Sequence, residues 1–169
     1  FAPPHIVPLV EVAPGPETAP EVVKFTDGLM KRIGKETLVM KEFVPGFIVN
    51  RLQNAIALPV LEMLVQGSAS PEDIDRAVKL TLGVRLPIVG VVQTLDFTGL
   101  DLVHDIMKGI GMAHPLIDER VEHGHLGAKT LKGIYDYGGR SEAEILNTRD
   151  KLYLQMVDHL SKIKALDPL

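Results

Sequence analysis

The apolar positions near the start of the chain follow two different periods. Residues 6–12 (IVPLVEV) are apolar and rich in β-branched side chains, which predicts a largely buried strand. Apolar residues then recur at helical spacing, which predicts a helix that opens with a capping box of Thr18 and Glu21 and ends at Gly34. Residues 37–41 predict a second strand. Because strand, helix and strand form a βαβ unit, we expect the edge of a larger parallel α/β sheet.

After the second strand the apolar spacing is that of helices. Ser70 and Pro71 are the residue types of an N-cap and a first helical position. Gly83 is expected to end that helix, and Pro59 to kink the helix before it. The helices that we expect span residues 46–66, 71–82, 89–109, 115–123 and 141–164, with an irregular segment over 124–139. The predicted fold is therefore mainly α, preceded by the βαβ unit.

The expected helices 46–66 and 89–109 are apolar over most of their circumference. A helix of that kind has to be covered on several sides. The remaining helices are too few to cover both, and two-fold dimers are the commonest assembly of soluble proteins. We therefore expect a homodimer that forms through the helical part.

The composition is that of an ordinary globular protein. Of the 169 residues 46% are apolar and 24% are charged, and the net charge of −4 gives no reason to expect nucleic acid or an anionic membrane as a partner. The apolar run from Leu86 to Val92 is too short to cross a membrane, which takes about 20 residues. The chain has no cysteine, which excludes disulfides and thiolate metal sites and fits a reducing compartment such as the cytoplasm.

Two polar residues stand out in apolar surroundings. Glu11 lies between two valines of the first expected strand, where a lone buried carboxylate is costly without a cation or donor beside it. Glu11 either orients a catalytic histidine or lies at an exposed strand edge or a solvated sheet end. Asn50, near the start of helix 46–66, either reaches the sheet edge where ligands bind in α/β proteins or makes a local hydrogen bond. Arg51 beside it is expected to form a salt bridge.

Other candidate sites are weaker. His123 and His125 lie close together but lack a third ligand at a metal-site spacing, so we expect no metal. His5 stands six residues before Glu11, roughly 20 Å away unless the chain folds back, and is interpreted as a turn residue. The sequence Gly109-Ile110-Gly111 begins like a phosphate-binding loop, but it follows an expected helix instead of a strand. We therefore expect no NAD-binding site within this chain.

Several longer strings resemble one family of enzymes. FAPPHIVPLVEVAPGPETAPE resembles the end of the nucleotide domain in 3-hydroxyacyl-CoA dehydrogenases, and VPGFIVNRLQ resembles the entry into their helical domain. SASPEDIDRAVKLTLG, DFTGLDLVHDIM and LGAKTLKGIYDY match further family segments in the same order. The resemblance covers about residues 1–137, and PGFIVNR, PEDID and KGIYDY together are far more specific than any one of them.

The resemblance implies three parts. They are the edge of a Rossmann NAD-binding domain over residues 1–43, the helical C-terminal domain of the dehydrogenase over 44–139, and a helical extension over 140–169. The family's glycine fingerprint, substrate-binding serine and catalytic histidine lie upstream, the histidine one or two residues before Phe1. We therefore expect that an upstream part has been removed, that NAD is the cofactor of the intact enzyme, and that this chain alone is inactive.

The resemblance also assigns two site residues. Glu11 matches the glutamate that pairs with the catalytic histidine, and Asn50 matches the asparagine that positions the substrate. Ala2, where many members have asparagine, and Leu131, which replaces a glycine of the family's KTGKG segment, depart from the pattern and bear on the acyl preference. The implied reaction is NAD-dependent oxidation of a 3-hydroxyacyl-CoA to the 3-ketoacyl-CoA, in fatty-acid β-oxidation or butanoate metabolism. The alternatives are a dehydrogenase of another hydroxy acid, such as carnitine or gulonate, and a non-catalytic helical dimerisation module.

Overall fold

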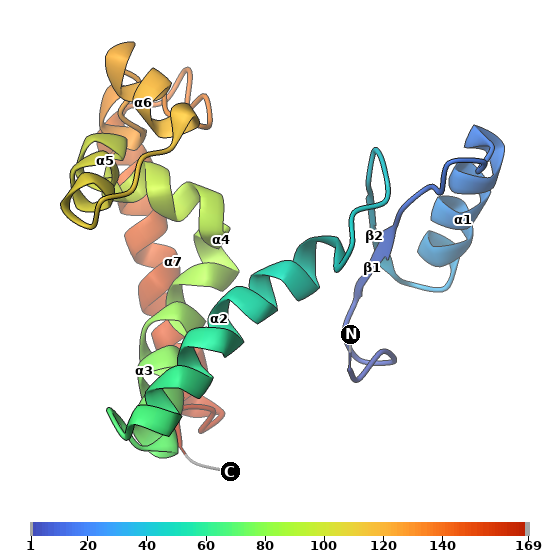
Figure 1. The fold of residues 1–169 in the computed structure, drawn as a ribbon, viewed down its shortest axis with the longest axis horizontal. Coiled ribbons are helices and arrows are strands. Elements are labelled where there is room, and N and C mark those ends of the chain that lie inside the picture. The colour runs from blue at the N-terminus through green and yellow to red at the C-terminus, as the bar shows by residue number, and fades with distance from the viewer. Residues whose placement is uncertain (1, 168–169) are drawn as a thin grey trace. The chain divides into compact units, whose positions relative to one another are not determined.

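The computed structural model describes residues 2–167, which form seven α-helices, one short 3-10 turn and two strands (Figure 1). The predicted mainly α fold with a preceding βαβ unit is confirmed. The chain divides into two compact units, Phe1–Ser68 and Ala69–Leu169, and each is described by itself. The domain boundaries expected after residues 43 and 139 stay a prediction.

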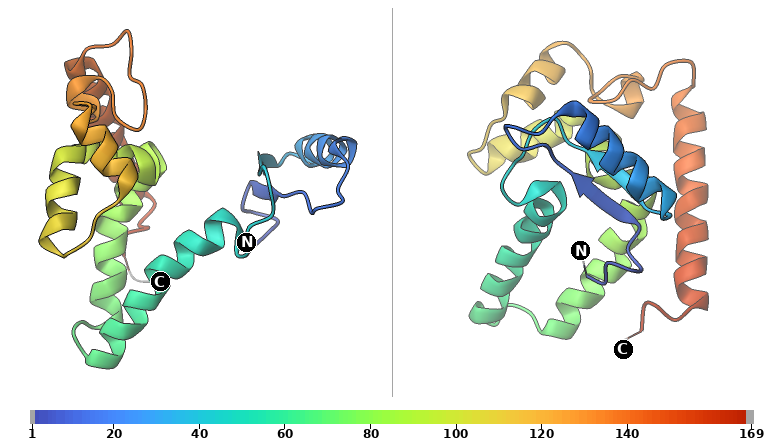
Figure 2. Two further views of the ribbon diagram at one scale, coloured as in Figure 1. Left: turned by 45° about the horizontal axis from the view of Figure 1, so that its top comes forward. Right: turned by 90° about the vertical axis from the view of Figure 1, so that its right-hand side faces the viewer.

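The N-terminal unit begins with the βαβ arrangement. Strand β1 (Leu9–Val12) and strand β2 (Glu36–Val39) pair in parallel, with Glu11 opposite Leu38. Helix α1 (Pro20–Arg32) connects them and runs alongside the strands (Figure 2). A parallel pair needs such a crossover, because a tight turn joins only antiparallel strands.

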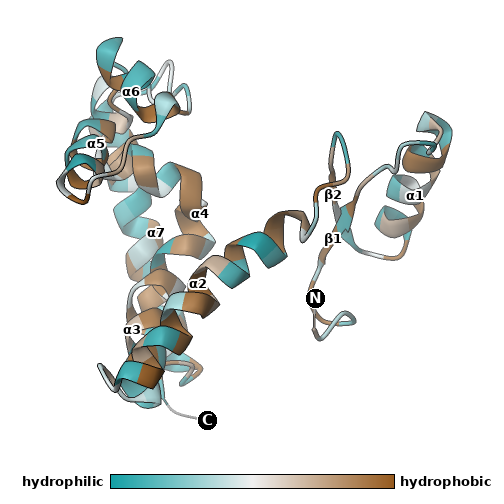
Figure 3. Ribbon diagram, viewed as in Figure 1, coloured by the Kyte–Doolittle hydropathy of each residue, from teal (hydrophilic) through white to brown (hydrophobic). Residues whose placement is uncertain are grey.

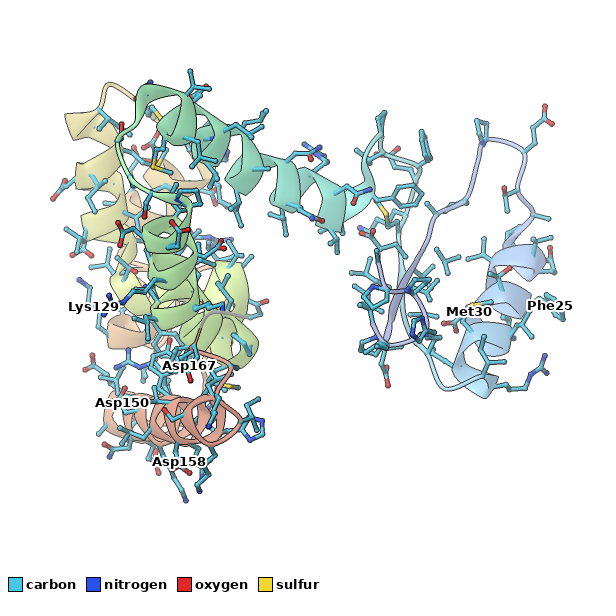
Figure 4. The ribbon with its side chains drawn as sticks, turned by 90° about the horizontal axis from the view of Figure 1, so that it is seen from below. Phe25, Met30, Lys129, Asp150, Asp158 and Asp167 are labelled. Atoms are coloured by element: carbon cyan, nitrogen blue, oxygen red, sulfur yellow. The ribbon has the colours of Figure 1, made fainter. Side chains whose placement is uncertain are left out.

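The start of α1 differs from the expectation. Its N-cap is Ala19, and Thr18 accepts a hydrogen bond from the backbone N–H of Gly15 at 2.9 Å, so Thr18 does not form the predicted capping box. Proline at the first helical position sets the start of α1 later than Thr18. Phe25 on α1 is 63% exposed and lies on the far side of the helix from the strands, whereas Met30 faces them (Figure 4).

Helix α2 (Phe47–Gln66) completes this unit and matches the predicted helix 46–66, with Pro59 inside it. It ends at Gly67 in the left-handed conformation, which glycine adopts without strain. Over Phe47–Gln66 no side chain is buried, and several large apolar ones are exposed. Figure 3 shows hydrophobic residues along much of this helix. The helix is long and apolar enough to cross a membrane by length and composition alone, a test that the interior helix of a soluble protein also passes.

The C-terminal unit is helical. Its elements are α3 (Pro71–Leu80), α4 (Leu82–Thr98), α5 (Leu100–Gly109), α6 (Pro115–Glu122), the 3-10 turn η1 (Ala128–Thr130) and α7 (Glu142–Lys162). Ser70 caps α3 as predicted, because its side chain accepts from the N–H of Asp73. The single helix expected over 89–109 is wrong: Gly99, with φ of 93°, separates α4 from α5, and the backbone is also non-helical at Gly90.

Burial explains the break at Gly99. Leu100, directly after it, is fully buried, and its N–H donates to the carbonyl of Leu126. A continuous helix would have used that N–H internally, so the chain turns at the glycine to bury Leu100. The predicted end at Gly83 is likewise wrong, since α4 begins at Leu82 and includes it.

The described core of this unit lies where α7 meets α4 and η1. Ala128, Tyr137 and Ile145 form a buried cluster against which Phe97 and Leu131 pack. The helix expected after residue 140 therefore belongs to the packed fold of this unit, because Ile145 in its first turn is part of that core.

Candidate functional site

Glu11 joins the end of β1 to the start of α2. One carboxylate oxygen, Oε1, accepts hydrogen bonds from the backbone N–H groups of Ile48 at 2.8 Å and Val49 at 3.1 Å. The N-cap residue of α2 is Gly46, which has no side chain to satisfy these groups. Glu11 therefore takes the place of the usual N-cap side chain, and its negative charge lies at the positive end of the helix dipole.

This contact gives Glu11 an environment that neither interpretation described. The side chain is half-buried, and its charge is met by two backbone donors, so Glu11 is neither a lone buried acid nor a freely solvated edge residue. Among residues 2–167, no hydrogen bond or ion pair reaches its second oxygen, Oε2. The carboxylate is thus held by one oxygen while the other remains available.

Asn50 follows in the first turns of the same helix, one residue after Val49, whose amide binds Glu11. Its side chain is exposed, and among residues 2–167 it makes no hydrogen bond, so the local hydrogen bond that the pattern allowed is not found there. Arg51 makes no ion pair within the same described part, which differs from the expectation. Arg51 instead lines a cavity of about 370 Å³ with Lys41 and Phe47, beyond the end of β2.

The histidine and glycine candidates carry no site. His123 and His125 stack with ring centroids 5.9 Å apart, and residues 2–167 hold no group of three possible metal ligands. Burial, followed by the nearby charges of Lys132 and Arg120, lowers the pKa of His125, which disfavours its charged form. Gly109-Ile110-Gly111 forms the C-terminal end of α5, whereas a phosphate-binding loop has to open a helix.

A buried carboxylate in the C-terminal unit escaped the sequence reasoning. Asp96, in α4, is 1% exposed and accepts hydrogen bonds from the N–H of Ile134 at 2.8 Å, the N–H of Tyr135 at 2.9 Å and the hydroxyl of Tyr137 at 3.0 Å. Burial, and secondly the charge of Asp96, raises the pKa of Tyr137. The signal in the sequence is an acid inside a strongly apolar helix, but its partners lie about forty positions further on.

The segment that Asp96 holds is closely packed. A Cβ at Gly133 would lie 2.2 Å from an oxygen of the Asp96 carboxylate, and one at Gly127 would lie 2.1 Å from the Asp96 carbonyl. Leu131 stands between these glycines with φ of 59°, in the left-handed region that glycine favours. The backbone conformation therefore explains why a glycine suits this position in the KTGKG pattern.

Comparisons with known proteins agree with the sequence resemblance. Residues 46–137 match the model of the 3-hydroxyacyl-CoA dehydrogenase C-terminal domain, and residues 1–43 match that family's NAD binding domain. A 5-formyl-3-hydroxy-2-methylpyridine 4-carboxylate 5-dehydrogenase of Mesorhizobium japonicum is 30% identical over 142 residues, which are 80% of this chain and 46% of that protein. An L-carnitine dehydrogenase of a Pseudomonas species is 29% identical over 171 residues, covering 98% of this chain and 53% of that protein.

A solved structure is similar over nearly the whole chain. The crystal structure of a 3-hydroxyacyl-CoA dehydrogenase from Archaeoglobus fulgidus has a TM-score of 0.82 and 29% identity, and the match covers 95% of this chain and 57% of that one. The chain spans about half the length of the proteins named here.

Proposed function

The chain belongs to the 3-hydroxyacyl-CoA dehydrogenase family, whose C-terminal domain model matches more than half of it, and from this premise we propose that it is the C-terminal part of an NAD-dependent dehydrogenase. The proposed reaction is oxidation of a 3-hydroxyacyl-CoA to the 3-ketoacyl-CoA. NAD is the cofactor of the family. The described residues contain no glycine-rich loop that opens a helix, so they do not fit the pyrophosphate of NAD, which in the proposed enzyme would bind outside them.

The observation that carries the proposal is the contact between Glu11 and α2. Glu11 lies near the carboxyl end of strand β1, and ligands of parallel α/β sheets bind at that end of the strands. Two amides orient the carboxylate through Oε1, and Oε2 is left for a cationic partner. When a catalytic histidine accepts a proton, the imidazolium that forms is stabilised by a nearby fixed negative charge. A carboxylate held in this way supplies that charge.

In the proposed mechanism the 3-hydroxyl group gives its proton to the family's histidine, which is expected one or two residues before Phe1. NAD, when bound, would supply the acceptor for the hydride on the same carbon. Glu11 stabilises the imidazolium, and Asn50, on the helix that Glu11 caps, holds the substrate oxygen in position. Since Glu11 holds the first turn of α2, the same carboxylate sets the position of Asn50.

Replacing Glu11 by glutamine tests the proposal. The carboxamide oxygen of Gln can still accept from Ile48 and Val49, so the fold is kept, but the charge is lost. In a protein that carries these residues together with the NAD-binding half, we expect kcat to fall by roughly 10²- to 10⁴-fold, the range of a general-base contribution. Glu36→Gln, an exposed acid on the neighbouring strand, is the matched control. An unchanged kcat in Glu11→Gln would leave Glu11 as a helix cap only.

A second substrate class has its own support. The match to the L-carnitine dehydrogenase covers 98% of this chain, so it takes in most of residues 138–169, which lie beyond the family model. A 3-hydroxy acid without coenzyme A, such as carnitine or gulonate, is therefore the second candidate. The match of residues 1–43 to an NAD binding domain speaks against a purely non-catalytic helical module.

The proposal extends to assembly and place in the cell. The large apolar side chains that α2 leaves exposed support a homodimer that forms through the helical part. An enzyme of fatty-acid β-oxidation or butanoate metabolism in the cytoplasm fits the proposed reaction and the absence of cysteine from the sequence.

A further inference from the structure

The cavity of about 370 Å³ lies where the chain passes from β2 into α2 (Figure 1). All of its walls belong to the N-terminal unit. Their apolar part is formed by Leu38, Val39, Met40, Val44, Phe47 and Ile48. Ligand pockets measure about 300–1,000 Å³, so this cavity is at the small end of the range and suits a short carbon chain instead of a whole coenzyme.

The cavity borders on Glu11. Leu38, in its wall, is the residue of β2 that pairs with Glu11 of β1, and neighbouring strands lie about 4.8 Å apart. Residues paired across a sheet have their side chains on the same face. Ile48, also in the wall, donates its N–H to Oε1 of Glu11 at 2.8 Å. A molecule in the cavity would therefore lie next to the carboxylate of the candidate site.

The lining also carries two cations that lack a counter-charge. Lys41 and Arg51 make no ion pair within residues 2–167, and neither does Glu42, the one acid of the lining. Two positive groups and one negative group leave one net positive charge. The stem of Arg51 passes close to Gly46, where a Cβ would lie 3.3 Å from Cγ of Arg51, so the glycine leaves room for this side chain. Apolar walls with a surplus of positive charge complement a carbon chain that ends in an anion.

Phe47 provides a second, independent mark of a ligand site. Its φ is 50°, in the left-handed region that a bulky residue rarely adopts. Its ring packs edge to face on Phe43, with centroids 5.6 Å apart, and forms part of the cavity wall. Backbone strain of this kind persists only where the surrounding structure imposes it, and it clusters at ligand sites.

We propose that this cavity binds the tail of the substrate, and that the tail is a short aliphatic chain that ends in a carboxylate. The inference rests on the proposed function for the reaction and adds the class of acyl group. Arg51 and Lys41 bind the terminal carboxylate, and the apolar walls cover the methylene groups. The 3-hydroxyl end then lies toward Glu11 and Asn50, which directly precedes Arg51 on α2. A tail without a charge would leave both cations without a partner.

The first test is the binding of tail analogues to the 169-residue chain, measured by nuclear magnetic resonance. Hexanoate has an aliphatic chain and a terminal carboxylate, and 1-hexanol is its neutral match. We expect hexanoate to shift the amide signals of residues 38–51 and to bind about 10-fold more tightly than 1-hexanol. This value lies between the roughly 5-fold of an exposed ion pair and the roughly 100-fold of a charge-assisted hydrogen bond away from water.

Arg51→Met should remove the difference between the two probes. Arg32→Met is the matched control, because Arg32 is an exposed arginine of α1 that does not line the cavity. Glu42→Gln should increase the preference for hexanoate, since it removes the opposing charge from the lining. Equal binding of hexanoate and 1-hexanol to the unchanged chain would overturn the inference, as would signal shifts confined to other residues.

The second test is turnover by a protein that carries the NAD-binding half. The substrates are 3-hydroxyhexanoyl-CoA and the same thioester with a carboxylate on its last carbon. We expect kcat/KM to be about 10-fold higher for the carboxylated thioester, and Arg51→Met to remove this preference. An equal loss with both thioesters in Arg51→Met would mean that the cavity receives the coenzyme or another part of the protein, which overturns the inference.

The outcomes separate this inference from the proposed function. Turnover of both thioesters at equal kcat/KM would overturn the carboxylate tail and leave the proposed dehydrogenase reaction intact. No NADH with either thioester would contradict the proposed reaction, whereas the binding of hexanoate would still decide what the cavity accepts. If Arg51→Met does not fold, Lys41→Met, at an exposed position of the same lining, is judged by the same outcomes.

Discussion

Replacing Asp96 should destabilise the C-terminal unit more than any surface change. Asp96→Ala leaves the N–H groups of Ile134 and Tyr135 and the hydroxyl of Tyr137 without their acceptor. An unsatisfied buried donor costs about 1–3 kcal/mol, and the two backbone groups are only partly buried, so water can reach them. We therefore expect a loss of about 3–5 kcal/mol in the free energy of unfolding, a large share of the roughly 5–15 kcal/mol of a typical domain.

Asp96→Asn should cost less, about 1–3 kcal/mol. Its carboxamide keeps one acceptor oxygen, and its amino group faces at least one of the backbone donors. The hydroxyl of Tyr137 can adapt by accepting a hydrogen bond, whereas a backbone N–H cannot. The order of the variants in stability should therefore be wild type, then Asn, then Ala.

Tyrosine fluorescence during urea unfolding measures this unit selectively. The three tyrosines, Tyr135, Tyr137 and Tyr153, all lie in the C-terminal unit, and the chain has no tryptophan. Asp158→Asn is the control, because Asp158 is an exposed acid of α7 that within residues 2–167 pairs only with Lys162 four residues away, a contact worth less than about 0.5 kcal/mol. An Asp96→Ala midpoint equal to that of the control would refute the role of Asp96 in holding residues 133–137.

Three further outcomes are expected. Because the pKa of Tyr137 is raised, its contribution to the free energy of unfolding is complete below about pH 10, the ordinary tyrosine value, and is lost as the pH rises further. The free energy of unfolding should therefore fall less steeply with alkaline pH in Tyr137→Phe. Equal pH dependence of the two proteins would contradict this. Light scattering of the chain at micromolar concentration should give about twice its 18.5 kDa, whereas a clean monomer would mean that the apolar side chains of α2 are covered in another way. Calorimetry of the 169-residue chain with NAD should show no binding, and micromolar affinity would show that the described residues hold a cofactor site.

Local patterns predicted the elements well where the signal and the structure concern the same few residues. The Ser70 cap and the end of α2 at Gln66 depend on neighbours within one or two turns, and the β1–α1–β2 unit follows from three consecutive elements. The apolar spacing predicted the helix α1, but periodicity does not show what covers the apolar side of a helix. The break at Gly99 was missed because it depends on the burial of Leu100 against a carbonyl 26 positions away.

The same difference between local and distant contacts applies to the site residues. The strand pattern indicated that Glu11 needs a partner, but the partner is the amide end of α2, which spacing alone does not reveal. Asp96 stands out in the sequence as an acid inside an apolar helix, but its role was missed because its hydrogen-bond partners lie about forty positions away. The roles of Glu11 and Asn50 in catalysis stay predictions.

The most direct test of the proposed function is the formation of NADH by a protein that carries this chain together with its NAD-binding half. The rate is measured by NADH absorbance with 3-hydroxybutyryl-CoA, and separately with carnitine and gulonate. We expect turnover of the acyl-CoA substrate and its loss in Glu11→Gln. Turnover of carnitine or gulonate in place of the thioester would contradict the proposed substrate class, and no NADH with any of the three would contradict the account of this chain as part of a hydroxyacyl-CoA dehydrogenase.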